Sequence, residues 1–297
     1  MCAISPKRVL VDVRGAHSGP TLLCIAGVHG NEPGGVAAVE RVSSELKKDL
    51  DNFRGRFVAL YGNLPALEED CRYIDEDLNR IWTDELISEA RTETSEQTER
   101  SQLLPAISEV LASSDTVTLL DLHSTSGDGP PFVPYFSKDG PTLLGAYGVP
   151  HVASTSMSIR GTLAAYFGKQ GIVSSVVEGG EHYAASTIDA LEAIIWLYLD
   201  DARQLSGNLA NVKHFGRLLQ TMCAGLPKSV AISSEFAIEP TDNFEMLPGF
   251  KNFQRVEKDQ VIARTAKGEV SVPESGWLLF PLYQPLGNVG FYLVTEH

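Results

Sequence analysis

The sequence LLCIAGVHGNEPGG (residues 22–35) leads from a short apolar run through glycine-rich sequence into a helical pattern. The run Thr21–Ala26 is unbroken and apolar, which is typical of a buried strand. In Gly34–Leu50, valines and a leucine recur near the helical period, which predicts a helix. A strand followed by a tight turn and a helix favours an α/β fold.

The same alternation of strands and helices continues through the first two-thirds of the chain. We expect further strands at Val9–Val13, Phe57–Tyr61, Val117–Leu122 and Ile172–Val177, and helical segments within Asp84–Ala112 and Ser186–Leu205. This pattern predicts an α/β sheet covered by helices on both faces.

The character of the sequence changes after about residue 220. Short strand-like stretches separated by Gly, Pro, Asp and Asn occur at Val230–Ile238, Gln254–Ala263, Trp277–Pro281 and Gly290–Val294. No long helix is predicted there. We therefore expect a larger α/β domain in residues 1–220 and a smaller β-rich C-terminal domain in residues 221–297.

The composition excludes several classes of protein. Of 297 residues, 43% are hydrophobic and 21% charged, which is ordinary for a globular protein. No apolar run approaches the roughly 18 residues that a membrane span needs, and the N-terminus has no signal-peptide core, so we expect a cytoplasmic protein. The net charge of −14 argues against nucleic acid or an anionic membrane as partner, but leaves a small anionic substrate open.

Two segments carry residue types that bind metals. His29 and Glu32 lie three residues apart in a glycine-rich turn directly after a strand, and His123 ends another strand-like run. Two histidines and a glutamate are a known ligand set for catalytic zinc, which keeps one coordination position for water. Asp121 lies two residues before His123 and so faces the same side of a strand, where it can accept a hydrogen bond from the metal-bound imidazole. Each motif alone is also compatible with a purely structural role.

Two further segments supply charged groups. The segment CRYIDEDLNR (residues 71–80) contains Arg72, Asn79 and Arg80, either as a clamp for a substrate carboxylate or as a solvated charge cluster. Glu178 terminates a strand and is followed by glycines. It is a candidate general base on the zinc-bound water, or else a carboxylate that caps the next helix. By spacing alone, Glu181 and His182 compete with it.

Four segments together resemble the succinylglutamate desuccinylase/aspartoacylase family of zinc carboxypeptidase-like enzymes. They are GVHGNEPGG (27–35), RYIDEDLNR (72–80), DLHST (121–125) and VEGG (177–180), in the order that the family has. The resemblance implies a zinc-carboxypeptidase-like mixed sheet flanked by helices, and an enzyme that removes the acyl group from a small, carboxylate-bearing N-acyl amino acid. The β-rich C-terminal part is also similar to the family's appendage.

The resemblance also implies residue roles. His29, Glu32 and His123 would bind one zinc ion per chain, and Glu178 would be general base and then general acid. Arg72 would stabilise the oxyanion.

The remaining implied roles concern the substrate. Asn79, Arg80 and Arg160 would hold a carboxylate, and Tyr283 would be a pocket tyrosine. Aspartoacylases have a tyrosine four residues before the arginine that corresponds to Arg160. This chain has Ser156 at that position, which puts N-acetylaspartate in doubt as the substrate.

The sequence leaves alternatives open. A metallocarboxypeptidase that acts on short peptides shares the ligand type, and a non-catalytic zinc-binding protein with a degenerate site is a different class of answer. A homo-oligomer is compatible with the sequence, which does not fix the oligomeric state. The acyl group and the amino acid are equally unspecified, because pocket shape decides them.

Overall fold

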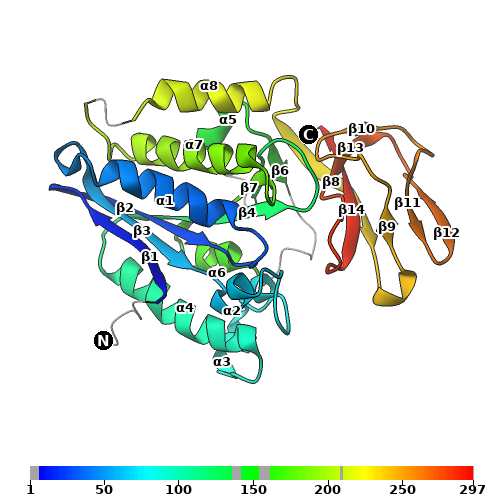
Figure 1. Cartoon of the computed structure of the whole chain (residues 1–297), viewed down its shortest axis with the longest axis horizontal. Coiled ribbons are helices and arrows are strands. Elements are labelled where there is room, and N and C mark those ends of the chain that lie inside the picture. The colour runs from blue at the N-terminus through cyan, green and yellow to red at the C-terminus, as the bar shows by residue number, and fades with distance from the viewer. Residues whose placement is uncertain (1–6, 136–141, 154–160, 208–209, 297) are drawn as a thin grey trace.

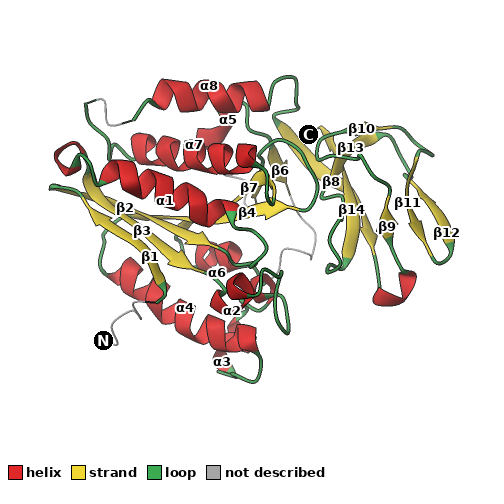
Figure 2. Cartoon of the chain, in the orientation of Figure 1, coloured by secondary structure: helices red, strands yellow, loops and turns green. Residues whose placement is uncertain are grey.

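A computed structural model describes residues 7–135, 142–153, 161–207 and 210–296 of the chain. The first part is a five-stranded sheet with helices on both faces, and the C-terminal part consists mainly of strands (Figures 1 and 2). Among the described residues, no helix has both the length and the apolar character needed to cross a membrane.

The five-stranded sheet has the strand order β1-β3-β2-β4-β7. Its strands are β1 (Val9–Arg14), β2 (His17–Ala26), β3 (Arg54–Tyr61), β4 (Val117–Thr125) and β7 (Val173–Glu181). β1 runs antiparallel to β3, and the neighbouring pairs among β3, β2, β4 and β7 are parallel. The carboxyl ends of β2, β4 and β7 therefore lie at one edge, where ligands bind in sheets of this kind.

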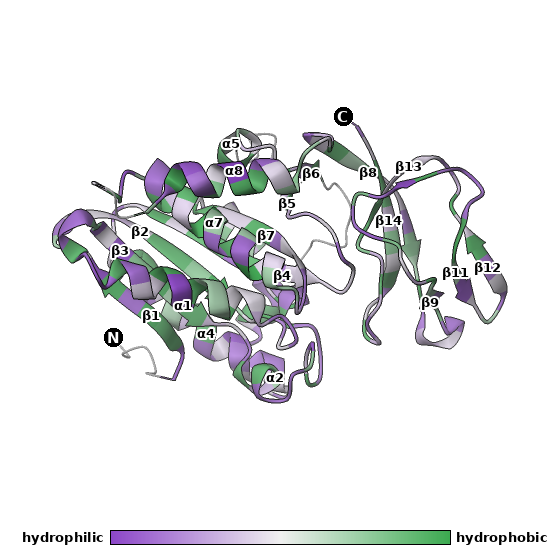
Figure 3. Ribbon diagram, turned by 45° about the horizontal axis from the view of Figure 1, so that its top comes forward, coloured by the Kyte–Doolittle hydropathy of each residue, from purple (hydrophilic) through white to green (hydrophobic). Residues whose placement is uncertain are grey.

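Helices cover both faces of this sheet. On one face lie α1 (Gly34–Leu46) and α7 (Ala185–Asp201), with α8 (Val212–Met222) and α5 (Thr142–Gly145) beyond them; on the other lie α4 (Ser95–Ala112) and α6 (Leu163–Lys169). Leu22 and Cys24 of β2 belong to the hydrophobic cluster on the first face, and Leu23 and Ile25 to the cluster on the second. Figure 3 shows hydrophobic residues along these central strands, between helices that also carry hydrophilic residues. Burial on both faces explains why the strand sequence is an unbroken apolar run.

Short helical elements complete this part of the chain. They are α2 (Leu64–Glu68), α3 (Asp84–Ser88) and the 3₁₀ turns η1 (Leu50–Asn52) and η2 (Leu78–Arg80).

A six-stranded sheet joins the two parts of the chain. Its order is β10 (Arg255–Val256), β13 (Gly276–Leu279), β14 (Val289–Glu296), β8 (Ser229–Ala237), β6 (His151–Ala153) and β5 (Val133–Tyr135). A separate three-stranded sheet contains β12 (Gly268–Ser271), β11 (Val261–Thr265) and β9 (Glu245–Met246), and the 3₁₀ turn η4 (Pro240–Asp242) follows β8. β6 pairs with the C-terminal strand β8, and β5 pairs with β6. Phe132, just before β5, forms a bridge with Glu178 of β7, so the segment that follows β4 contacts both sheets.

The predicted mixed sheet with flanking helices and a β-rich C-terminal region is confirmed, but details differ. The expected helix Gly34–Leu50 ends at Leu46, and the stretch Gln254–Ala263 divides into β10 and β11, which belong to different sheets. The strands β5 and β6 and the helix α8 were not predicted. Residue 220, the proposed domain boundary, lies inside α8, so the domain division stays a proposal.

Candidate metal centre and active site

A tight turn after β2 presents His29 and Glu32. Gly27 has a φ of +71°, a backbone conformation that glycine adopts without strain. A Cβ on Gly30 would lie 2.0 Å from the carbonyl of Ala66, so this position needs a glycine for close backbone approach. The turn therefore brings two buried polar side chains, 4% and 2% exposed, to the end of the strand.

β4 supplies His123 at the same edge of the sheet. Asp121 of β4 pairs with Ile25 of β2, and His123 pairs with Glu178 of β7. The side chain of His123 is 3% exposed and that of Asp121 is fully buried. Parallel register thus places residues from three strands beside one another.

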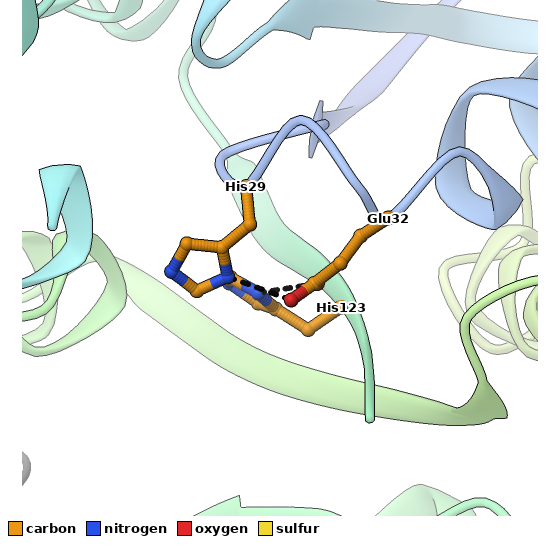
Figure 4. A group of neighbouring side chains, drawn as sticks. All are labelled: His29, Glu32 and His123. Atoms are coloured by element: carbon orange, nitrogen blue, oxygen red, sulfur yellow. Dashed lines mark hydrogen bonds and ion pairs between the residues drawn. The ribbon is translucent and has the colours of Figure 1, made fainter. Parts of the chain in front are cut away.

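The side chains of His29, Glu32 and His123, here called the ligand cluster, converge as Figure 4 shows. His29 Nδ1 lies 2.7 Å from Glu32 Oε1, and His123 Nδ1 lies 3.0 Å from Glu32 Oε2. All three ligand atoms lie within 4.8 Å of one another. Among the described residues, this is the one group of such side chains arranged to hold a metal ion.

The opposite ring nitrogens contact further carboxylates. His29 Nε2 lies 3.0 Å from Asp77 Oδ1, and His123 Nε2 lies 3.0 Å from Asp121 Oδ1. An imidazole that donates through Nε2 offers the lone pair of Nδ1 to a metal. Two imidazole acceptors and a carboxylate this close together need a shared positive charge, so the residues fit a divalent cation such as zinc.

The pKa shifts of Glu32 and His123 agree with the requirement for a positive charge within the ligand cluster. Although burial favours the neutral acid, the neighbouring His29 and His123 hold the pKa of Glu32 well below its usual range. Burial lowers the pKa of His123, but Asp121 and Glu32 together raise it well above the usual value. Without a cation, a proton on His123 supplies the positive charge.

The segment Cys71–Arg80, here called the arginine loop, packs against the ligand cluster. Arg72 Nη2 donates to Asp77 Oδ2 (2.9 Å), and its Nη1 lies 3.7 Å from Glu32 Oε1. Although burial favours the neutral acid, His29 and Arg72 hold the pKa of Asp77 well below its usual range. Asp77, which was not predicted as a site residue, thus connects Arg72 to His29.

Asn79 and Arg80 both line the cavity next to the ligand cluster. Asn79 Oδ1 accepts a hydrogen bond from the backbone N–H of Leu163 (2.8 Å), and its Nδ2 lies 3.1 Å from His123 Nε2. Arg80 Nη1 donates to the carbonyl of Asn79 (2.8 Å). Both ends of the Asn79 amide therefore contact protein groups beside the histidine.

Glu178 is buried at the carboxyl end of β7 and lines the same cavity. Its Oε2 has no hydrogen-bond partner among the described residues. Burial raises the pKa of Glu178 to about 8, the charge of His123 opposes the shift, and Glu32 adds to it. A strand-end carboxylate with a free oxygen and a pKa near neutrality is suited to proton transfer.

The competing residues on this segment lie elsewhere. Glu181 is exposed, and His182 is buried, with Nδ1 2.8 Å from Ser124 Oγ. Neither belongs to the cavity lining.

Tyr283, one of the predicted substrate residues, does not line the cavity. Tyr283 is 39% exposed; its hydroxyl donates to the carbonyl of Leu247 (2.7 Å) and accepts from the N–H of Phe250 (2.9 Å). Arg160 lies outside the described residues.

Glu96, in the first turn of α4, holds the arginine loop in place. Its side chain is fully buried. Oε1 accepts from Asn63 Nδ2 (3.0 Å) and the N–H of Ile74 (2.8 Å), and Oε2 accepts from the N–H groups of Asp75 (3.0 Å) and Glu76 (3.2 Å). This role could not be predicted from the sequence, because an acidic residue in a first helical turn is common.

Asn252 connects the loop after β4 to the C-terminal strands. Its Nδ2 donates to Thr125 Oγ1 (2.9 Å) and to the carbonyl of Gly127 (3.1 Å), and its Oδ1 accepts from the N–H of Phe280 (2.7 Å). The cavity beside the ligand cluster, with a volume of about 180 Å³, is lined by residues from both sides of this connection.

Known proteins share both the sequence motifs and the fold. Residues 18–195 match the family model of the succinylglutamate desuccinylase/aspartoacylase catalytic domain. A probable aspartoacylase of Prochlorococcus marinus subsp. pastoris is 42% identical over 62 residues, which are 21% of this chain and 20% of that protein. The N-acyl-aromatic-L-amino acid amidohydrolase (carboxylate-forming) A of Danio rerio is 31% identical over 121 residues, 39% of this chain and 37% of that protein. The matches thus span well under half of these relatives.

Solved structures are similar over nearly the whole chain. The succinylglutamate desuccinylase/aspartoacylase of Rhodobacter sphaeroides superposes with a TM-score of 0.69 at 18% identity, covering 96% of this chain and 88% of that one. The product-bound ectoine utilization protein EutE (DoeB) of Ruegeria pomeroyi gives a TM-score of 0.67 at 17% identity, covering 96% and 87%. These similarities confirm the fold, including the β-rich C-terminal region.

Proposed function

The chain belongs to the succinylglutamate desuccinylase/aspartoacylase family, and from this premise we propose that it is a zinc-dependent hydrolase that cleaves the amide bond of a small N-acyl amino acid. One observation carries the proposal: the ligand cluster lies in the same cavity as Glu178, whose Oε2 is buried and without a partner among the described residues. Relatives named as desuccinylases, aspartoacylases and N-acyl-amino acid amidohydrolases support the choice of substrate class.

His29 Nδ1, Glu32 and His123 Nδ1 would hold the metal ion. Two histidines and one glutamate are typical of catalytic zinc rather than of magnesium or calcium, which prefer oxygen ligands. When bound, zinc supplies a Lewis acid that polarises the amide carbonyl and makes a water molecule more acidic.

Glu178 acts as the base and then the acid of the reaction. It removes a proton from the attacking water and then passes this proton to the leaving amine. Arg72 lies beside the cluster and stabilises the negative charge that develops on the carbonyl oxygen.

The substrate's carboxylate is held by Arg80, which lines the cavity. Asn79 supports this position through its carbonyl, which accepts from Arg80. Arg160 is proposed as a second contact to the carboxylate. Holding the carboxylate would position the amide bond next to the metal site. The reaction is then faster, because the reacting groups are already oriented when the substrate binds.

The proposal is tested by measuring amine release from a panel of N-acetyl, N-succinyl and longer N-acyl amino acids, with metal analysis of the same sample. We expect hydrolysis by the zinc-loaded protein, loss of activity after chelation, and recovery when zinc is restored. Trimming of peptide C-termini without N-acyl amino acid hydrolysis would instead identify a metallocarboxypeptidase. Bound zinc with no hydrolysis of any panel member would leave only a metal-binding protein.

A further inference from the structure

Two chemically different groups of residues line the cavity. The ligand cluster, Glu178 and the two arginines of the arginine loop form one group. Apolar and aromatic side chains from the six-stranded sheet and the connection before β14 form the other, beside the polar Gln284 and Asn288. We call the apolar group the apolar wall; it consists of Pro134, Val152, Ile232, Phe280, Val289 and Tyr292.

The apolar wall is continuous with a hydrophobic cluster of the protein. Val152 and Tyr292 belong to this cluster, and Ile232, Phe280 and Val289 pack against it. The side chains are thus fixed by packing, and their free surface favours an apolar group of the ligand.

Phe280, a residue of the apolar wall, has a strained backbone conformation. Its φ is +51°, which is a genuine outlier for a bulky residue. The N–H of Phe280 donates to Asn252 (2.7 Å), and its ring packs edge-on against Phe132 (5.1 Å between centroids) and Tyr292 (6.0 Å). Strain of this kind persists where the surrounding structure enforces it, commonly at ligand sites.

Few positively charged side chains line the described part of the cavity. Arg72 and Arg80 are the basic side chains there apart from the ligand histidines, and Arg72 is already paired with Asp77. A substrate carboxylate can therefore pair with Arg80. Among the described lining residues, a second carboxylate against the apolar wall would find no further cation to pair with, which is unfavourable for a buried charge.

We propose that the substrate carries a single carboxylate and an apolar acyl chain or side chain, so that the chain is a deacylase of apolar rather than dicarboxylic N-acyl amino acids. The carboxylate binds Arg80 and the apolar group packs on the apolar wall. This inference rests on the proposed function and specifies its substrate class.

Two matched substrate pairs test the inference. N-butyryl- and N-succinyl-leucine differ by a methyl or a carboxylate at the end of the acyl chain. N-acetyl-norvaline and N-acetyl-glutamate differ in the same way at the end of the side chain. We expect kcat/KM to favour the apolar member at least tenfold in one pair or both, since one methylene in an apolar pocket is worth roughly 10- to 200-fold. A tenfold preference for the charged member in either pair, or no preference in both, overturns the inference.

Binding provides a second readout that does not depend on turnover. Calorimetric titration of the Glu178→Gln protein with the same four compounds should give tighter Kd values for the apolar members. If no compound is hydrolysed by the zinc-loaded protein but the apolar members bind more tightly, the proposed function fails while the ligand class stands. If hydrolysis occurs with a preference for the charged members, only the inference on substrate class fails.

A lysine introduced into the apolar wall, compared with a lysine at an exposed position of the same strand, tests whether the wall contacts the substrate. Ile232→Lys should reduce or reverse the apolar preference, whereas Ala237→Lys, at an exposed position of the same strand β8, should preserve it. Ile232→Gln is the milder variant if the lysine protein does not fold. An unchanged preference in the folded Ile232 variants would show that the wall does not contact the substrate. A preference for charged members that disappears in Arg160→Ala would assign a second carboxylate site outside the described residues and overturn the inference.

Discussion

Replacing Glu96 with glutamine should loosen the arginine loop while leaving the shape of the side chain almost unchanged. The carboxylate accepts four hydrogen bonds in a fully buried position, two at each oxygen. A glutamine amide has only one oxygen. Its NH₂ group would face two donors of the protein, and both of these donors would lose their acceptor.

The expected loss of stability follows from this count. A hydrogen bond to a charged group contributes about 1.5–3 kcal/mol, so the loss of two corresponds to about 3–6 kcal/mol of unfolding free energy. For a domain of this size, 1 kcal/mol shifts the melting temperature by about 2–4 °C, so we expect a decrease of about 6 °C or more. The arginine loop carries Arg72 and Asp77, and kcat/KM should also fall by roughly tenfold or more, since each 1.36 kcal/mol of lost transition-state stabilisation is a factor of ten.

The assay combines thermal unfolding, zinc content and kinetics for Glu96→Gln. Glu93→Gln is the matched control, because Glu93 is exposed just before the same helix. The zinc content should stay near one per chain, since the metal ligands lie on other elements. If Glu96→Gln melts within a degree of the Glu93→Gln protein, the carboxylate does not stabilise the loop and the reasoning is wrong.

Four further outcomes follow from the site. Glu178→Gln should keep bound zinc while kcat falls by about 100- to 10,000-fold; a near-normal kcat would show that the base is another group. Asp121→Asn should weaken zinc binding by about 10- to 100-fold in competition with a chelator, and an unchanged affinity would contradict its contact with His123. His29→Ala and His123→Ala should each lose bound zinc in metal analysis, whereas the exposed His17 can be replaced by alanine without loss. Zinc binding to the metal-free protein at pH 7 should release at least one proton, because the raised pKa of His123 keeps it charged until the metal replaces the proton. Affinity therefore rises with pH up to that pKa, and calorimetry in two buffers of different ionisation enthalpy that finds no proton release would contradict this.

Strands with long apolar runs were predictable from the sequence, whereas the short ones were not. The run Thr21–Ala26 lies in β2 because burial on both faces demands apolar residues at successive positions. In contrast, β5 and β6 have three residues each, too few to show a period. The helix α8 does carry a helical repeat of apolar residues, Val212, Phe215, Leu219 and Met222, but it has only 11 residues and lies where the character of the sequence changes, so it was not predicted.

The three residues of the ligand cluster could be singled out from the sequence because each lies next to a strong local signal. His29 and Glu32 lie in a glycine-framed turn, and His123 ends an apolar strand. Asp77 has two acidic neighbours in sequence, and only the folded loop shows which carboxylate reaches His29. Tyr283 illustrates the opposite error, since its sequence neighbours line the cavity while its own hydroxyl binds the backbone at Leu247 and Phe250. Alternation along an irregular loop cannot be inferred from sequence.

Two different sheets supply the ligand cluster and the apolar wall, and this arrangement has an evolutionary consequence. The ligand cluster and Glu178 lie at the strand ends of the five-stranded sheet, whereas most of the apolar wall comes from the six-stranded sheet. Mutations in β8 or β14 can therefore diversify which compounds are accepted while the reacting groups are inherited unchanged. Paralogues that share the motifs of residues 27–35 and 121–125 but differ at position 232 or 289 would be expected to consume different metabolites by one common chemistry.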